Sequence, residues 1–195
     1  MVDRLTTTLT RAGLLLALVV GAACSSDPSD ATTETAAAAT TAAAPTTTAA
    51  PTTTGVQPVG FTTTAATVTA ADGEVCEVCL WVAATADQRS RGLMGVTDLG
   101  GADGMAFVYD APSTGQFWMR NTPTPLSIAW IAADGEVVTI TDMAPCEDRE
   151  GCPTYAPTGA YRYAIETFQG DLADLGITEG AIVAVGGSCA PTSTG

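Results

Sequence analysis

The sequence predicts a mainly β protein of the α+β class: a single small domain, like a barrel or sandwich, with one or two short helices and disulfide staples. Between Val59 and Cys189, short apolar segments alternate with Gly, Pro and Asp, which is typical of short strands joined by turns. The segment Ala133-Asp134-Gly135 separates two such runs and is a clear hairpin signal. Five cysteines fall in the same region, so a small core could gain from cross-links.

Residues 1–24 are typical of an export signal. Arg4 and Arg11 give a positive start, and a short apolar run over residues 12–20 follows them. That run is shorter than the roughly 20 residues that a membrane-spanning helix needs. The junction Gly21-Ala22-Ala23-Cys24 resembles a bacterial lipoprotein cleavage site, with Gly21 where Leu is usual, and Cys24 would then be lipidated. The alternative is an ordinary secretory signal cleaved near Ala23.

Residues 25–58 form an Ala/Thr/Pro-rich segment without hydrophobic periodicity. Such a composition cannot bury enough apolar surface to offset the entropy of ordering, so we expect a disordered linker. An extended chain of this length suits a domain held away from a membrane. We therefore expect an exported protein anchored by lipid to the outer face of the bacterial membrane, with a β-rich domain over residues 59–195.

The expected elements of that domain follow from local patterns. Thr85 and Gln88 have the spacing of a capping box, so a short helix should begin there and end near Gly92. Asp171–Leu175 has the composition of one helical turn. The expected strands are short apolar runs bounded by turn residues: Val75–Ala83, Gly104–Tyr109, Ser127–Ala132, Glu136–Asp142, Ala160–Phe168 and Ala181–Val185.

The cysteines suggest two disulfides in an oxidising compartment. Cys146 and Cys152 share a short Pro/Gly loop and are expected to bond each other. Cys76 and Cys79 lie three residues apart on one expected strand, hence on opposite faces, and cannot easily bond each other. One of them should pair with Cys189, and Cys79 is favoured. A redox or zinc role for the Cys-x-x-Cys segment is the weaker alternative, since it lies on a strand and has no second such motif.

Composition excludes several classes of function. The formal net charge is −14, from 21 acidic and 7 basic residues, so the surface should repel nucleic-acid phosphates. The absence of His removes His-ligated metal sites and His-dependent nucleophiles. We expect no metal and no cofactor, and a monomer.

Several motifs resemble those of the domain-of-unknown-function family 192, over about Val75 to Val185. They are Arg91-Gly-Leu-Met-Gly95, Gly104-Met-Ala-Phe107, Phe117-Trp-Met-Arg-Asn-Thr122 with Pro125-Leu126, Pro145-Cys146, Cys152-Pro-Thr-Tyr155, Tyr163-Ala-Ile-Glu166 and Gly176-Ile177. The resemblance implies a small β-rich domain, often exported or lipid-anchored, without a settled biochemical function. Where the family usually has Asp after Pro-Leu, this chain has Ser127.

Five residues are candidates for a ligand site: Arg91, Trp118, Asn121, Tyr155 and Glu166. An Arg clamps anions, and a Trp face can stack on a ring. A carboxylate on a strand would be a site candidate if burial perturbed it. Three of them have a structural alternative: Arg91 could pair with Glu166 or Asp142, Trp118 could be core, and Asn121 could hold a turn.

Three functional hypotheses follow. The first is a tethered, non-enzymatic module that binds a small polar ligand, a glycan or an envelope component. The second is a structural or assembly domain without a ligand. The third is a hydrolase of envelope polymers that uses Glu166 and Asp142 as paired carboxylates, with no other catalytic residue identified.

Overall fold

Nine strands and two short helices make up residues 55–189, the part of the chain that the computed structural model describes. The expected export signal, Cys24 and most of the expected linker lie outside these residues. In chain order the elements are β1 Thr62–Thr69, β2 Val75–Ala83, α1 Ala86–Arg91, β3 Gly104–Ser113, β4 Phe117–Trp118, β5 Leu126–Ile131, β6 Val137–Met143, β7 Thr154–Tyr155, β8 Tyr161–Phe168, α2 Asp171–Asp174 and β9 Ile182–Val185. None of the helices among these residues is long and apolar enough to cross a membrane.

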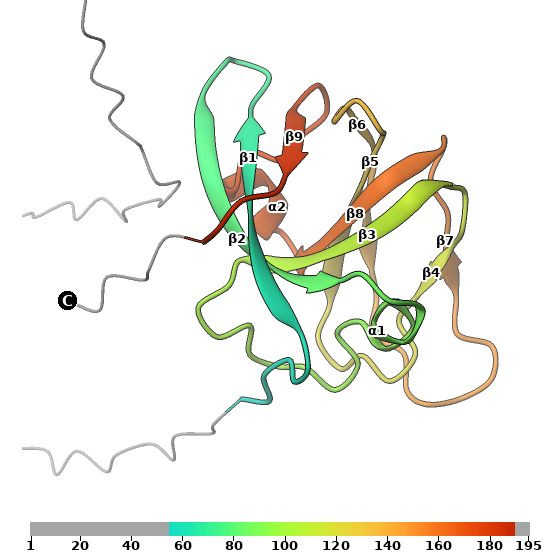
Figure 1. Ribbon diagram of the computed structural model, residues 1–195. Helices are drawn as coiled ribbons and strands as arrows, with labels where there is room; N and C mark the ends of the chain where they lie inside the picture. The colour runs from blue at the N-terminus through green and yellow to red at the C-terminus, as the bar shows by residue number, and fades with distance from the viewer. Residues whose placement is uncertain (1–54, 190–195) are drawn as a thin grey trace, which may run out of the picture.

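Seven strands form one curled sheet in the order β6-β5-β8-β3-β2-β1-β9, and β4 pairs with β7 in a second, two-stranded sheet (Figure 1). The pairs are antiparallel except for β2 and β3, which are parallel. The curl brings the two edge strands together at one bridge, where Glu136 lies opposite Ile182. The predicted β-rich α+β fold is confirmed, as an open sheet that approaches a barrel without closing as one.

The central strands are covered on both faces. All six residues of β5 are buried, so its side chains fill two separate cores in alternation. One face belongs to an aromatic core, which includes Phe107, Phe117, Trp130 and Tyr161. The other face belongs to an aliphatic core, which is covered in part by α2. This division places β4 and the turn after α1 over the aromatic core.

Most of the expected elements are present with close boundaries. The strand over Val75–Ala83 and the capping box at Thr85 are found as predicted. β1 was not predicted, because its sequence, TTTAATVT, contains only one side chain larger than Thr or Ala. The strand is stabilised by its pairing with β2 on one side and β9 on the other, and less by the hydrophobicity of its own side chains.

The domain begins earlier than residue 59. We call residues 55–61 the entry segment, since they lead from the N-terminal part of the chain into β1. The backbone of Val56 exchanges hydrogen bonds with Thr97, and the side chain of Gln57 donates to Asp98. The part of the expected linker after residue 54 is therefore packed against the domain.

Two disulfides hold the described residues together. Cys79 bonds Cys189, which joins β2 to the end of the chain after β9, and Cys146 bonds Cys152 within one loop. Cys76 is buried and points away from Cys79, as the strand alternation predicted. No cysteine in residues 55–189 is a free thiol.

The two disulfides should differ in their contribution to stability. The Cys79–Cys189 bond spans 110 residues and the Cys146–Cys152 bond spans 6. Loop-closure entropy then predicts losses of about 5 and about 2 kcal/mol in the free energy of unfolding when each pair is replaced by Ser. Urea unfolding of the two double variants measures this, and equal losses would contradict it.

Candidate functional site

A cavity of about 360 Å³ opens between α1, β3, β4 and β8. Its size is within the range of small-molecule sites. The lining residues come from five segments: Ala86, Arg89, Ser90, Arg91, Gly92, Leu93, Met94, Phe107, Tyr109, Gln116, Phe117, Trp118, Thr122 and Glu166. Polar and apolar groups both face the opening, so the cavity can hold a ligand of mixed character.

One wall is α1, whose position is fixed by local sequence. The Thr85 hydroxyl accepts from the Gln88 amide, and the Gln88 side chain accepts from the Thr85 amide. The helix ends at Gly92, which has φ of +46° and lies directly over the Phe107 ring. A Cβ at this position would be 3.0 Å from Phe107 Cζ, so Gly is needed for α1 to approach β3 this closely.

Two arginines of α1 line the cavity. The Arg89 guanidinium donates to the carbonyls of Ala84 and Val108 and lies 4.6 Å from the centroid of the Tyr109 ring. The Arg91 guanidinium donates to the Val59 carbonyl and lies over Phe61. Neither forms an ion pair within the described part of the chain. The alternative that Arg91 pairs with Glu166 or Asp142 is therefore wrong.

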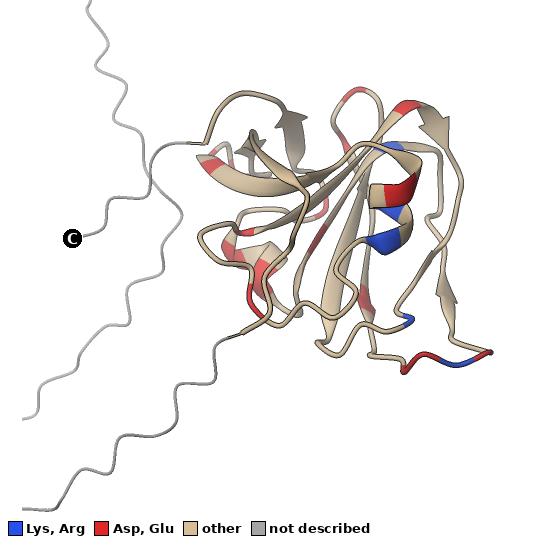
Figure 2. Cartoon of the chain, turned by 60° about the horizontal axis from the view of Figure 1, so that its bottom comes forward, with Lys and Arg blue, Asp and Glu red and all other residues tan. Residues whose placement is uncertain are grey.

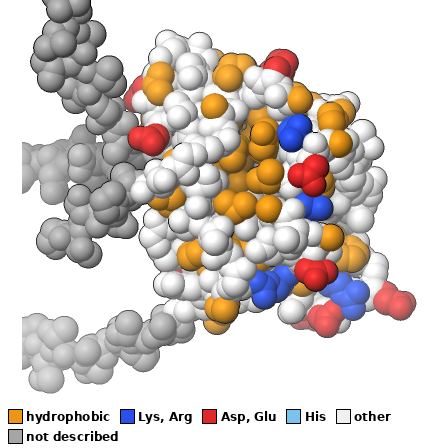
Figure 3. Space-filling view, in the orientation of Figure 1, with side chains coloured by type: hydrophobic (Ala, Val, Ile, Leu, Met, Phe, Trp, Pro, Cys, Tyr) orange, Lys and Arg blue, Asp and Glu red, His pale blue; other side chains and the backbone are white. Residues whose placement is uncertain are grey.

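The cavity differs in charge from the chain as a whole. The last turn of α1 carries Arg89 and Arg91, and its first turn carries Asp87. In Figure 2 this helix is accordingly coloured both blue and red, and the other red positions, with a few blue ones, are spread over the rest of the domain. On the face seen in Figure 3, hydrophobic side chains occupy the middle, and Arg side chains lie toward the right and the lower edge. Two full positive charges line the cavity in a protein whose net charge is −14.

Glu166 is the buried acid of the site. Its neighbours on the flanking strands are Met105 and Ile128, so strand alternation aims its side chain into the aromatic core beneath the cavity. Only 4% of the residue is exposed, and no residue in the range 55–189 hydrogen-bonds its carboxyl group. Burial raises the pKa of Glu166 to about 8, so the group is mostly protonated at neutral pH.

Aromatic rings form the remaining walls. Phe107 and Phe117 contact each other edge to face at 5.0 Å between centroids, and Tyr109 packs in the same way on Tyr161. Burial, together with the hydrogen bond to Tyr161, raises the pKa of Tyr109, so its phenol stays neutral. Trp118 is 49% exposed, which leaves a large apolar surface available beside the opening.

The structure brings three of the five candidate residues together: Arg91, Trp118 and Glu166 line this one cavity. Asn121 does not; it lines a separate depression beside the Cys146 loop. Its φ of +55° and the hydrogen bond from the Gly95 amide to its carbonyl fit the alternative in which Asn121 holds a turn.

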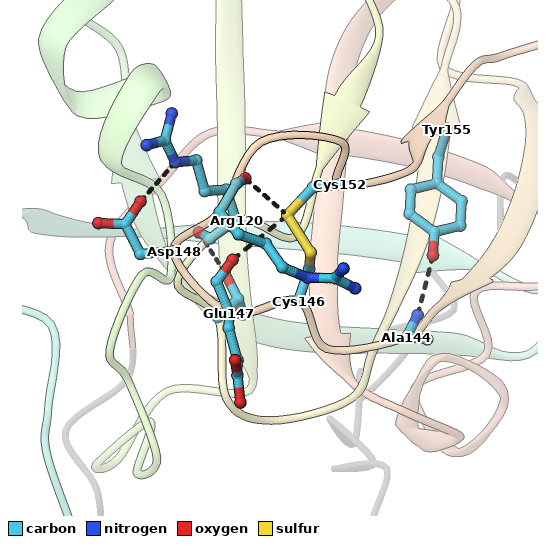
Figure 4. The surroundings of a disulfide bond; sticks show 9 residues. Arg120, Ala144, Cys146, Glu147, Asp148, Cys152 and Tyr155 are labelled. Carbon is cyan, nitrogen blue, oxygen red and sulfur yellow. Dashed lines mark hydrogen bonds and ion pairs between the residues drawn. A yellow bond between two sulfur atoms is a disulfide. The ribbon is translucent and has the colours of Figure 1, made fainter.

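Tyr155 also lies away from the cavity. It pairs with Phe117 across the small sheet, and its hydroxyl accepts a hydrogen bond from the Ala144 amide (Figure 4). The same view shows the disulfide loop beside Arg120, which forms an ion pair with Asp148. Tyr155 therefore fixes the loop instead of facing the site.

The expected carboxylate pair does not share a site. Asp142 lies opposite Ser127, which lies opposite Thr167, so all three side chains are on one face of the sheet. Glu166 precedes Thr167 and points to the other face. The Asp142 carboxylate accepts hydrogen bonds from the side chains of Ser127 and Gln169. Ser127, where the resembled family usually has Asp, is accordingly outside the cavity.

The candidates from the sequence did not include the other polar side chains that line the cavity, which are Arg89, Ser90, Tyr109, Gln116 and Thr122. Arg89 and Arg91 are two residues apart on a helix and should face different directions. They reach one cavity because it lies at the end of α1, where Arg89 folds across Tyr109. The capping box was the available signal, since it located the short helix that presents both arginines.

Comparisons with known proteins agree with the fold. The family model DUF192, described as "Uncharacterized ACR", matches residues 67–185. A crystal structure of a protein of unknown function from Novosphingobium aromaticivorans DSM 12444 is 30% identical, with a TM-score of 0.54, and the match covers 72% of this chain and 99% of that one. A "putative transcription regulator" from Sinorhizobium meliloti 1021 is 25% identical, with a TM-score of 0.57 and coverage of 66% and 97%. No curated protein matches the chain.

Glu166 should make stability fall as pH rises. Its folded-state pKa is about 8 against an ordinary 4.5, so the native state binds more protons than the unfolded state between these values. Stability is therefore full below about pH 4.5 and is lost as pH rises toward 8.

Glu166→Gln removes this titration while keeping the shape of the side chain. From pH 5 to pH 8 the variant should gain about 3 kcal/mol in free energy of unfolding relative to the wild type. Urea unfolding at both values measures the change, and the difference between the two pH values cancels any constant effect of the amide. A difference that does not depend on pH would show that Glu166 is ionised when folded.

Proposed function

The chain belongs to the DUF192 family, and on that basis we propose that it is an exported, surface-tethered module that binds a small ligand in the cavity at the end of α1. The observation that carries the proposal is Glu166, a buried carboxyl group without a hydrogen-bond partner in the described residues, at a cavity open to solvent. A bound ligand would supply the missing partner.

The energetic cost of Glu166 supports a functional role. The Glu166 carboxyl is not among the described side-chain groups that are sealed from solvent without a partner, so it keeps some contact with solvent. Burial still disfavours its charged form, which is a cost that an apolar residue would not have. Groups whose pKa is shifted by burial inside a cavity are typical of functional sites. Arg91 and Trp118 at the same opening add a charged donor and a flat apolar surface.

The other two hypotheses are less well supported. A purely structural role would favour internal partners for the polar groups, yet Glu166 has none among residues 55–189. A two-carboxylate hydrolase needs both acids at one cleft, and Asp142 lies on the opposite face of the sheet from Glu166. We therefore propose binding without catalysis.

The proposed location outside the cytoplasm is supported by the disulfides, which persist in oxidising compartments. Lipidation at Cys24 would hold the domain at the membrane, with residues 25–54 as the spacer. The domain would then meet ligands of the cell envelope, at the far end of a chain attached to the bilayer.

A binding screen tests the cavity. Small polar molecules and glycans are assayed against the full-length chain by thermal shift, and hits are titrated by calorimetry. For a cavity ligand, Trp118→Ala should weaken binding at least about tenfold, because stacking surface is lost. Val75→Ala, at an exposed apolar residue outside the cavity, is the control. If no hit responds to Trp118→Ala, the structural hypothesis is preferred.

Metabolic labelling tests the anchor. An alkyne fatty acid supplied to bacteria that express the full chain should label the wild type and fail to label Cys24→Ser, since the thiol is the acylation site. The variant should also move from the membrane fraction to the medium. An unlabelled wild type would instead indicate an ordinary secretory signal.

A further inference from the structure

We infer that the ligand of this cavity is a small organic anion, a carboxylate carried on a flat apolar body. The inference deepens the proposed binding function and depends on it. Three features of the described part of the chain carry it: two guanidinium groups that have no carboxylate partner there, a buried acid that has no hydrogen-bond partner there, and aromatic walls between them.

The first feature is the missing counter-ion. Among residues 55–189, Arg120 pairs with Asp148, and the other arginines form no ion pair. Arg89 and Arg91 are the two of these that line the cavity; in the described residues they donate to backbone carbonyls and lie over aromatic rings. A guanidinium has five N–H donors, so each keeps donors for a further acceptor. An anionic oxygen at the opening would be bound by charge-assisted hydrogen bonds.

The second feature is the state of Glu166. The groups that line the cavity with it are Arg89 and Arg91 on α1 and Tyr109 on β3, and Tyr161 packs behind on its own strand; β4 and β5 bring no titratable side chain to the cavity. None of these groups stabilises the ionised Glu166 carboxylate enough to offset the effect of burial, which raises its pKa. A protonated carboxyl is a hydrogen-bond donor, so it can donate to a carboxylate.

The first two features together exclude a ligand of the opposite charge. An organic ammonium would pair with an ionised Glu166, and aromatic walls also attract cations. It would then have to enter beside Arg89 and Arg91 and remove the proton from the buried acid. Both steps cost free energy, whereas a carboxylate needs neither.

The walls define the rest of the ligand. Trp118 at the opening and the paired rings of Phe107 and Phe117 offer flat apolar surfaces. A planar ring or conjugated chain would bury more area against them than a branched polyol would. We therefore assign an aromatic or unsaturated carboxylate as the ligand class.

Three probes of one shape and different charge test this class: benzoate, benzamide and benzamidine. Calorimetric titration of the full-length chain at pH 6 should give binding to benzoate that is at least about fivefold tighter than to benzamide and about tenfold tighter than to benzamidine. Preference for benzamidine, or no binding by benzoate, overturns the ligand class. A ligand found in the screen that depends on Trp118 would still support the proposed function in either case.

Variants add a second readout. Arg91→Gln should weaken benzoate about tenfold and leave benzamide nearly unchanged, because only the anion loses a charge-assisted bond. Arg149→Gln is the matched control, since it removes the same charge from an exposed loop outside the cavity. Equal effects of the two variants would mean that general electrostatics, and not the cavity, sets the preference.

The pH dependence of benzoate binding tests whether Glu166 is the hydrogen-bond donor. If only the protonated form binds benzoate, affinity should fall about tenfold from pH 6 to pH 9 for a group with pKa about 8, and Glu166→Gln should abolish that dependence. The amide of Gln can donate to the carboxylate, so the variant should still bind benzoate at pH 6. An affinity that rises with pH would overturn the assignment.

Discussion

The pairing of β8 between β3 and β5 is the constraint on which the rest of the structure depends. It sets the alternation that divides the interior into an aromatic and an aliphatic core. Because the side-chain period of a strand is two, a slip of one residue would exchange Glu166 with Thr167. Gly104 helps to fix the register, since a Cβ there would be 2.4 Å from the Glu166 carbonyl oxygen.

The fold could be predicted from sequence further than the site could. Hairpin signals and strand-like runs located most of the sheet, and strand alternation correctly separated Cys76 from Cys79. β1 was missed because its stability comes from its neighbours. At the site, residue chemistry selected Arg91, Trp118 and Glu166, but also Asn121 and Tyr155, whose roles depend on a backbone angle and a loop contact. To predict which face of the sheet a polar strand residue occupies, one must know the register of the strand with all its partners. The sequence of a single segment does not contain that information.

The cavity places two arginine side chains at its rim and a buried, mostly protonated acid beneath them. Its two arginines lie over aromatic rings at the rim, and their guanidinium groups donate to backbone carbonyls. Its acid is mostly protonated at neutral pH, because burial raises the pKa of Glu166 and no donor among residues 55–189 stabilises the carboxylate. The net effect is a local positive potential inside a strongly acidic protein. The net negative charge of the protein thus attracts cations at long range. In the proposed site, an anion would be favoured only at contact distance from the two arginines.

The contacts of the entry segment determine how a force on the N-terminal side of the chain would reach the domain. Gln57 is bonded to Asp98, and the carbonyls of Val59 and Gly60 are held by Arg91 and by Gln88 of α1. Tension applied along the chain from its N-terminal side would therefore be borne first by the contacts of Val56 and Gln57 with Thr97 and Asp98, then by α1 and the Arg91 guanidinium, and only then by β1. The contacts of Arg91 and Gln88 with the Val59 and Gly60 carbonyls thus couple a pull on the entry segment to the rim of the cavity before β1 is reached.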